Sequence, residues 1–386
     1  MPTDAVRRLA RGSNDFGFDL YRRLRDKPGN LVFSPASITT ALAMTWGGAK
    51  GETAEQMRRV LHLEGAPADV MSTSGKLAAA LQDPQSPITF RIANQLFGEK
   101  SYRFEQRYLD ATKNAYGAPL EPMDFRNGAD TARASINGWV EQQTEKRITE
   151  LLPAKALDDQ TRLVLVNAIY FLGDWPEPFA MDSTRPEPFF TAKDVKKDVP
   201  TMHRTDMLRF AARDGLTALE LPYKGGKMSM LFVVPDAVDG LAAIEQSLDG
   251  ATLDALVGAL TSQLVAVSLP KFKIEPGESL SLGDELQKMG MPLAFDRDRA
   301  DFTAIANPPE PDDRLYISKV FHKAFVRVDE KGTEASAATA ISMARAGGAP
   351  PKPVFFKADR PFLFFLRDND TKLVLFAGRV ADPSAK

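Results

Sequence analysis

The most informative stretch of the sequence is Val328-Asp329-Glu330-Lys331-Gly332-Thr333-Glu334-Ala335-Ser336-Ala337-Ala338-Thr339-Ala340-Ile341-Ser342-Met343-Ala344-Arg345-Ala346-Gly347-Gly348. Before this stretch, the even-numbered positions from Val320 to Val328 are apolar apart from one histidine, and the odd-numbered ones include charged residues. Such alternation is typical of a strand with one buried face. A strand therefore leads directly into the quoted residues.

The residues after Gly332 are mostly small and uncharged, and no proline occurs until Pro350. An alanine-rich helix is one interpretation, because alanine is the best helix former. However, the interspersed threonines and serines lower the helix propensity, and no apolar stripe at helical spacing is present to dock a helix. An exposed loop is the better prediction.

The same loop has the pattern of a strand when its residues are divided by parity. One set passes from small to larger apolar side chains and suits a core: Thr333, Ala335, Ala337, Thr339, Ile341 and Met343. The other set is small or polar and suits solvent: Glu334, Ser336, Ala338, Ala340, Ser342 and Ala344. No proline removes a ladder donor, and Gly332 can take the backbone angles needed to turn back beside the preceding strand. The loop is therefore predicted to be able to become a strand.

Residues Val328 to Ala335 resemble the proximal hinge of the reactive-centre loop of serpins, a family of serine protease inhibitors. Other stretches similar to the family follow in family order from about residue 13 to the C-terminus. The resemblance is to an inhibitory, prokaryotic-type member and places the loop at about residues 331–352. The hinge residues that it implies are Glu330, Gly332, Thr333, Glu334, Ala335, Ser336, Ala337 and Ala338.

For the fold, the resemblance implies an α+β protein with one domain over residues 1–386. It would have a large central mixed sheet, two further sheets, about eight to nine helices and an exposed reactive-centre loop. For the activity, it implies a suicide-substrate inhibitor of serine endopeptidases. The loop is cleaved, the acyl-enzyme is trapped, and residues of about 332–344 insert into the central sheet as a new strand.

A buried polar cluster is also implied. The long apolar run Leu163 to Trp175 predicts a strand covered on both faces, and Asn167 is the conspicuous polar residue inside it. The segment Phe33 to Ile38 resembles the family segment that places two hydroxyls under the main sheet. By resemblance the sheet-opening polar cluster consists of Ser34, Ser37, Asn167 and His322. Trp175 would be the aromatic residue of the upper part of the sheet.

At the N-terminus, Ser13 or Asn14 is predicted to cap a first helix that runs through about Arg25. Beyond residue 180 the chain is rich in predicted strands, one of them over residues 314–328.

Composition excludes several classes of function. The net charge of -2 and the pI near 6.1 give no electrostatic footprint for nucleic acid or for an anionic membrane. The absence of cysteine excludes disulfides and thiol chemistry but leaves the compartment open. Residues 1–12 carry no apolar signal-peptide core, and no apolar run is long enough to span a membrane. The family resemblance suggests an extracellular protein, whereas a complete chain without a signal peptide would be cytoplasmic.

No catalytic or metal site is predicted. The three histidines, His62, His203 and His322, are too few and too far apart in sequence for a metal cluster, and no cofactor motif is present. A serine hydrolase is a distant alternative, but its G-x-S-x-G motif is absent. Because His322 lies on the apolar face of its strand, we interpret it as a core histidine with a satisfied hydrogen bond.

The scissile bond has two candidate positions. The family's usual spacing of about seventeen residues, counted from Glu330, places it between Ala346 and Gly347, where a small residue suits elastase-like or subtilisin-like pockets. Arg345 comes one residue earlier and would suit the acidic pocket of a trypsin-like protease. The spacing favours Ala346, and cleavage after Arg345 remains the alternative.

The expected partner is a serine protease, of trypsin-like or elastase-like or subtilisin-like specificity, in a covalent complex. The protein itself is expected to be a monomer with a tendency to form loop-sheet polymers. The main alternative within the fold is a non-inhibitory serpin that acts as a binding or chaperone-like protein. Such proteins carry a charged, bulky or proline-containing hinge, and residues 333–340 contain none of these apart from Glu334.

Overall fold

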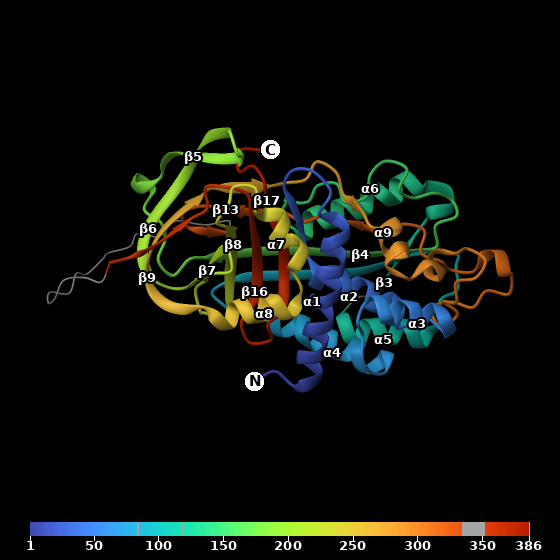
Figure 1. Cartoon of the computed structure of the whole chain (residues 1–386). Coiled ribbons are helices and arrows are strands. Elements are labelled where there is room, and N and C mark those ends of the chain that lie inside the picture. The colour runs from blue at the N-terminus through green and yellow to red at the C-terminus, as the bar shows by residue number, and fades with distance from the viewer. Residues whose placement is uncertain (83–84, 118, 334–351, 386) are drawn as a thin grey trace.

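The computed structural model of the chain describes residues 1–82, 85–117, 119–333 and 352–385 (Figure 1). Nine α-helices lie in these ranges, as the sequence predicts. They are α1 (Asp4–Leu24), α2 (Pro35–Trp46), α3 (Gly51–Val60), α4 (Pro67–Leu81), α5 (Gln106–Tyr116), α6 (Phe125–Gln143), α7 (Leu241–Ser247), α8 (Gly250–Ala259) and α9 (Gly283–Met289). Within the described ranges, none of the helices combines the length and the hydropathy that a membrane crossing requires.

The largest sheet has nine strands and lies mainly in the C-terminal half of the chain. Eight of them follow the order β1 (Leu31–Phe33), β17 (Val374–Val380), β16 (Phe362–Asp368), β8 (Met228–Pro235), β7 (Leu216–Pro222), β6 (Val195–Arg213), β9 (Thr261–Pro270) and β15 (Val354–Lys357). The ninth, β5 (Arg185–Ala192), pairs with β6. β15 runs parallel to β9 and the other pairs are antiparallel, so the sheet is mixed.

A second sheet has six strands and carries the candidate site. Its order is β10 (Phe272–Ile274), β13 (Val326–Val328), β14 (Gly332–Thr333), β4 (Leu163–Asp174), β2 (Thr89–Glu99) and β3 (Leu120–Met123). β2 and β3 are parallel, and the other neighbours are antiparallel. A third sheet consists of β11 (Leu280–Ser281) and β12 (Phe321–His322). The α+β class with one large mixed sheet and further sheets is therefore confirmed.

Helices cover both faces of β4, which explains its nearly continuous apolar sequence. Figure 1 shows α6 on one side of β4 and α2 on the other. Val164 and Val166 belong to the apolar cluster that contains α6. Leu163 and Leu165 pack with the cluster that contains α2. Alternate side chains of the strand therefore enter different cores, as expected for a central strand.

The start of α1 differs from the prediction. The helix begins at Asp4, and Thr3 caps it by accepting a hydrogen bond from the backbone of Val6. The residues expected to cap it make tertiary contacts instead: the Ser13 hydroxyl donates to Thr39 at 3.1 Å, and Asn14 accepts from the backbone N–H of Val374 at 2.8 Å. Sequence patterns for caps do not distinguish a cap from a polar residue used in packing.

The predicted strand over residues 314–328 is also shorter than expected. Only β12 and β13 within it have ladder partners, because β10 and β11 are short. The alternation itself is present, since His322, Ala324, Val326 and Val328 are buried and the odd-numbered residues between them are partly exposed. The side chains thus follow the predicted period even where the backbone hydrogen bonds of a strand are missing.

Candidate functional site

The first two residues of the predicted arm already lie inside the six-stranded sheet. Gly332 is paired with Asp174 and Thr333 with Gly173 on β4, while Thr333 is also paired with Val328 on β13. Residues 329–331 form the turn between β13 and β14, with the N–H of Asp329 donating to the carbonyl of Gly332 at 3.0 Å. The chain therefore reverses beside its parent strand, as the sequence predicts.

Gly332 is required by the close approach of two backbones. Its φ angle is +155°, and a Cβ at this position would collide with the carbonyl oxygen of Gly173 and with the Cα of Asp174. Any other residue would have to push β14 away from β4. The hinge glycine is therefore explained by packing as well as by conformational freedom.

Thr333 rests on a pair of stacked aromatic rings. Its side chain is 3% exposed, and its hydroxyl shares a hydrogen bond of 2.6 Å with the phenol of Tyr223. Tyr223 stacks on Trp175 with ring centroids 4.5 Å apart. Burial raises the pKa of Tyr223 far above its ordinary value, so the phenol keeps its proton. The inward position of Thr333 agrees with the parity argument.

Hydrogen bonds to its backbone carbonyls connect the turn of residues 329–331 to the segment that follows β4. The N–H of Trp175 donates to the carbonyl of Lys331 at 2.8 Å, and its indole N–H donates to the carbonyl of Asp329 at 3.1 Å. The N–H of Phe179 donates to the carbonyl of Glu330 at 2.8 Å. Trp175 thus holds the turn through both its backbone N–H and its indole N–H.

Glu330 is a buried carboxylate with two partners. It is 5% exposed, forms an ion pair with Lys271 at 2.9 Å and accepts a hydrogen bond from the Thr184 hydroxyl at 2.9 Å. Burial opposes ionisation of this carboxyl, but the bonds from Lys271 and Thr184 outweigh burial and keep its pKa below the ordinary value. The ionised side chain therefore anchors the base of the hinge.

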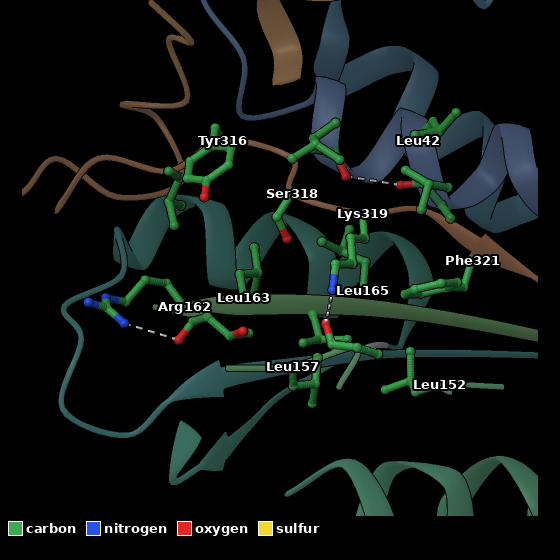
Figure 2. A pocket seen from close by; sticks show the side chains of 18 of the residues that line it. Leu42, Leu152, Leu157, Arg162, Leu163, Leu165, Tyr316, Ser318, Lys319 and Phe321 are labelled. Carbon is green, nitrogen blue, oxygen red and sulfur yellow. Dashed lines mark hydrogen bonds between the residues drawn. The ribbon is translucent and has the colours of Figure 1, made fainter. Parts of the chain in front are cut away.

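Below Thr333, the facing edges of the two strands that flank the hinge are unpaired as far as the structure describes the chain. Among the described residues, no ladder joins β4 to the segment 316–328. A cavity of about 160 Å³ opens between them at the lower end, lined by residues 162–165 on one side and residues 314–322 on the other (Figure 2). The cavity therefore lies beside the start of β4, and no ladder among the described residues pairs with the edge of β4 between this cavity and β14.

The predicted polar cluster is found in part. The imidazole Nε2 of His322 accepts a hydrogen bond from the backbone N–H of Ser34 at 3.0 Å, and the Ser34 hydroxyl accepts from the N–H of Ser37 at 3.1 Å. Burial lowers the pKa of His322 to about 4, so the ring is neutral. Asn167 lies in β4 opposite Asn94, but its side chain is outside the described part of the structure.

The rest of the predicted loop is also outside the described residues. This holds for the hinge residues Glu334, Ala335, Ser336, Ala337 and Ala338. It holds equally for both candidate scissile bonds, with Arg345, Ala346 and Gly347.

One grouping resembles the side chains of a hydrolase. The Ser268 hydroxyl lies 3.2 Å from Nδ1 of His203, and Nε2 of His203 lies 3.2 Å from a carboxylate oxygen of Glu187. However, Nε2 forms no hydrogen bond among the described residues, and Ser268 of β9 and His203 of β6 are direct cross-strand neighbours. Both residues lie within extended strands, whereas the serine of an α/β-hydrolase lies on a sharp strand-to-helix turn.

A family model described as serpin (serine protease inhibitor) matches residues 11–383. The chain belongs to the serpin family. Leukocyte elastase inhibitor of Xenopus tropicalis is 40% identical to this serpin over 385 residues, covering 97% of the chain and 99% of the relative. Human serpin B4 is 38% identical over 395 residues, covering 97% and 99%.

Solved structures agree with the fold. The structure "Cleaved Serpin 42Da" matches this serpin with a TM-score of 0.88 and 34% identity, covering 99% of this chain and 100% of that one. The family model describes protease inhibitors and not enzymes. The two named relatives are vertebrate proteins, so the comparisons do not support the expected prokaryotic type.

Sequence reasoning missed the residues that hold the hinge from outside. Tyr223, Lys271 and Thr184 come from three separate segments, and none of them stands in a recognisable motif. The only available signal was Glu330, since a carboxylate beside an apolar strand must find a cation if it is buried. That rule predicts a partner but not its position in the chain.

Proposed function

We propose that this serpin inhibits serine endopeptidases as a suicide substrate and acts as a single domain over residues 1–386. A protease cleaves the loop at about residues 331–352 and forms an acyl-enzyme. The arm of about residues 332–344 then inserts into the six-stranded sheet and carries the attached protease away. Distortion of the protease oxyanion site stops deacylation, so a covalent complex accumulates.

One observation carries this proposal, the position of β14. Gly332 and Thr333 form the start of a strand between β13 and β4, and the edges below them are unpaired in the described residues. An arm that continues from Thr333 would gain a ladder on both sides. Eleven further residues, 334 to 344, at about 3.3 Å each would extend the strand by about 36 Å, enough to move a tethered protease along the molecule.

The uncleaved fold is then a kinetic trap. Insertion adds backbone hydrogen bonds and buries Ile341 and Met343, each worth about 1.5–3 kcal/mol on full burial. The same unpaired edges could accept the loop of another molecule, so the monomer is expected to form loop-sheet polymers. We propose Ser34, Ser37, Asn167 and His322 as the buried latch that opposes premature opening.

A non-inhibitory serpin is the alternative within the family. Its hinge would contain a charged, bulky or proline residue, whereas residues 333–340 are small or β-branched apart from Glu334. Ser336 differs from the alanine common at that position, but it belongs to the outward set and should insert without cost. The hinge composition therefore favours the inhibitor.

The test is incubation with a trypsin-like and an elastase-like or subtilisin-like serine protease, followed by a denaturing gel. The expected product is a band that contains both proteins and survives denaturation. The same serine protease with its nucleophile blocked is the control and should give no such band. Complete turnover of the loop by every protease, without a stable complex, would overturn the proposal.

A further inference from the structure

The sequence contains two Asn-Gly pairs, and both lie in α6. Asn127-Gly128 is in the first turn of this helix, and Asn137-Gly138 is in its middle. An asparagine before a glycine is chemically labile, because the backbone nitrogen of the glycine can attack the side-chain amide without hindrance from a Cβ. The two pairs have the same chemistry, so a difference between them in the folded protein comes from their surroundings.

The pair in the middle of α6 is protected by its contacts. Asn137 is 7% exposed, and its side chain makes three hydrogen bonds to the loop after the helix. Its Nδ2 donates to the carbonyl of Leu152 at 2.9 Å, and its Oδ1 accepts from the N–H groups of Leu151 and Leu152 at 3.1 and 2.8 Å. The helix continues through Gly138, so backbone hydrogen bonds also fix the peptide unit between the two residues. Attack at Asn137 would have to break all of these bonds.

The pair in the first turn lies at an interruption of the helix. Gly128 has φ −148° and ψ 44°, which are not helical angles, so Phe125 to Asn127 form a separate turn. This turn can change its conformation at Asn127 without unfolding the rest of α6. Asn127 is exposed, and a Cβ placed on Gly128 would meet only the Cβ of Thr131, at 3.9 Å. Both reacting groups are therefore accessible.

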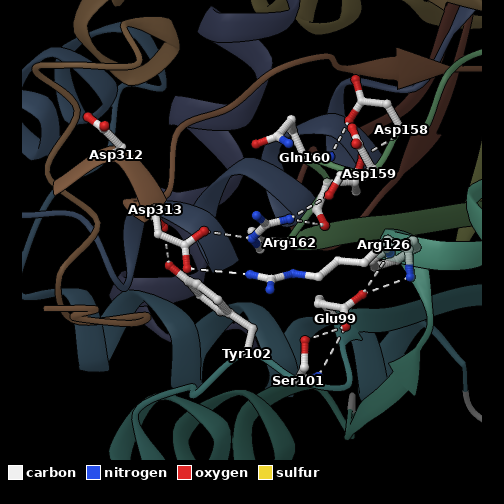
Figure 3. A network of polar contacts seen from close by, with 12 residues as sticks. Glu99, Ser101, Tyr102, Arg126, Asp158, Asp159, Gln160, Arg162, Asp312 and Asp313 are labelled. Atoms are coloured by element: carbon white, nitrogen blue, oxygen red, sulfur yellow. Dashed lines mark hydrogen bonds and ion pairs between the residues drawn. The ribbon is translucent and has the colours of Figure 1, made fainter. Parts of the chain in front are cut away.

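The contacts of this turn hold its beginning more firmly than its end. The buried carboxylate of Glu99 accepts the N–H groups of Phe125 at 2.7 Å and of Arg126 at 3.2 Å (Figure 3). Asp124 caps the helix, and its Oδ1 accepts from the backbone N–H of Asn127 at 3.1 Å and from its side-chain Nδ2 at 3.0 Å. A single solvent-exposed hydrogen bond thus holds the side-chain amide of Asn127, and such a bond is easily released.

We propose that Asn127 is a site of spontaneous deamidation in the folded protein and that Asn137 is not. The backbone nitrogen of Gly128 forms a bond to Cγ of Asn127 and gives its proton to water. The bond from Cγ to Nδ2 breaks, and Nδ2 takes a proton from water and leaves as ammonia. A second water molecule opens the resulting cyclic imide at either carbonyl, which gives aspartate or isoaspartate. No oxidant or reductant takes part.

The conversion changes the cap of α6. A carboxylate replaces the amide that donates to Asp124, so a hydrogen bond gives way to repulsion between like charges three residues apart. Isoaspartate also lengthens the main chain by one carbon atom within the first turn. The N–H groups that Glu99 and Asp124 accept then lose their alignment. The first turn of α6 is therefore loosened in the deamidated protein.

The test is peptide mapping by mass spectrometry after incubation of the whole folded protein at body temperature in mildly alkaline buffer. Trypsin cuts after Arg126, Arg133 and Lys146, so the two pairs fall into separate peptides, 127–133 and 134–146. Protein that has not been incubated gives the background from digestion. Protein incubated in concentrated guanidinium chloride exposes both pairs equally. Gly128→Ala and Gly138→Ala are the matched variants, and circular dichroism establishes that each is folded.

In the folded protein, residue 127 should be deamidated at least about tenfold faster than residue 137, which corresponds to a difference of about 1.4 kcal/mol in the free energy of local opening. In guanidinium chloride the two rates should be similar. Gly128→Ala should slow the reaction at residue 127, because alanine adds a Cβ and favours a continuous helix. Gly138→Ala should leave the rate at residue 127 unchanged.

Three results would overturn the proposal. They are equal rates at the two sites in the folded protein, no deamidation of residue 127 above the background, and an unchanged rate at residue 127 in Gly128→Ala. The deamidated fraction can be separated by its extra negative charge. Its backbone amides at residues 125–128 should exchange hydrogen faster than those of the unmodified protein, and unchanged exchange there would contradict the effect on the cap.

Discussion

The hydroxyl of Thr333 and the phenol of Tyr223 share a buried hydrogen bond of 2.6 Å that joins the second residue of β14 to the aromatic pair of Tyr223 and Trp175. We predict that Tyr223→Phe destabilises the protein by about 1–3 kcal/mol, because it leaves the buried Thr333 hydroxyl unpaired. Urea unfolding measures the change. Thr333→Val is the matched variant that removes the other partner without changing the shape of the side chain.

The double variant decides whether the bond itself is responsible. If the bond stabilises the hinge, the double variant Tyr223→Phe, Thr333→Val should lose clearly less free energy of unfolding than the sum of the losses in the two single variants. Strict additivity would mean that the two hydroxyls contribute independently and that the hinge is held by other contacts.

The inward position of Thr333 predicts a switch from inhibitor to substrate. Thr333→Arg would bring a charge into the buried position between β13 and β4, which opposes insertion because a buried unpaired charge is costly. We expect several-fold more inhibitor to be cleaved per molecule of protease trapped, measured as the stoichiometry of inhibition. Ser336→Arg is the control, since it belongs to the outward set and should remain close to wild type. Equal behaviour of the two variants would contradict the assignment of faces.

Because His322 is neutral in the folded protein, we predict that the free energy of unfolding decreases in mild acid. Burial lowers its pKa from 6.5 to about 4, so between these values the unfolded chain binds a proton that the native state does not. Stability is therefore fully present above pH 6.5 and decreases as the pH falls toward 4, by about 3 kcal/mol in total. Urea unfolding across this range measures the slope. His322→Gln keeps a neutral acceptor for Ser34 and should flatten it, whereas an unchanged slope would assign it to other groups.

The hydrogen bond between Ser34 and His322 is also predicted to oppose polymer formation. His322→Ala removes the acceptor of the Ser34 N–H and leaves that donor buried, which weakens the connection between α2 and the segment beside β4. We expect polymers to form at a lower temperature, detected on native gels after heating. His203→Ala, in the other large sheet, is the control for loss of an imidazole. Polymer formation indistinguishable from wild type would argue against the latch.

The peptide released from covalent complexes identifies the scissile bond. We predict from the spacing that it begins at Gly347, which means attack after Ala346 by an elastase-like or subtilisin-like protease. A peptide that begins at Ala346 instead means attack after Arg345 by a trypsin-like protease. Mass spectrometry separates the two products, and a first residue outside 344–349 would contradict both.

Strong periodicity made part of this fold predictable. Leu163 to Trp175 reads as a strand covered on both faces because both faces are apolar, and the alternation before Val328 correctly predicts which side chains are buried. The inward position of Thr333 follows from the separate alternation within residues 333–344. These features depend only on local pattern and on burial.

Features that depend on tertiary partners were not predictable. Asn14 has the residue type of a helix cap, yet its side chain binds the backbone of Val374 more than three hundred residues away. Tyr223 reads as an ordinary core aromatic, and nothing in its neighbourhood indicates that its phenol meets Thr333. In the same way, the sequence shows Ser37 as a helix-start serine but not that its hydroxyl meets no hydrogen-bonding group among the described residues.

The two-residue strand β14 also affects the kinetics of insertion. Pairing of Gly332 and Thr333 with β4 fixes the alignment of the arm before cleavage, so insertion can grow from an existing nucleus and need not search for one. A strand offered by another molecule has no such nucleus, and its ends must first meet by diffusion. Insertion of the molecule's own arm should therefore be faster than insertion of a loop from another molecule. Polymers should form only where heat or mutation opens the sheet before a protease cuts the loop.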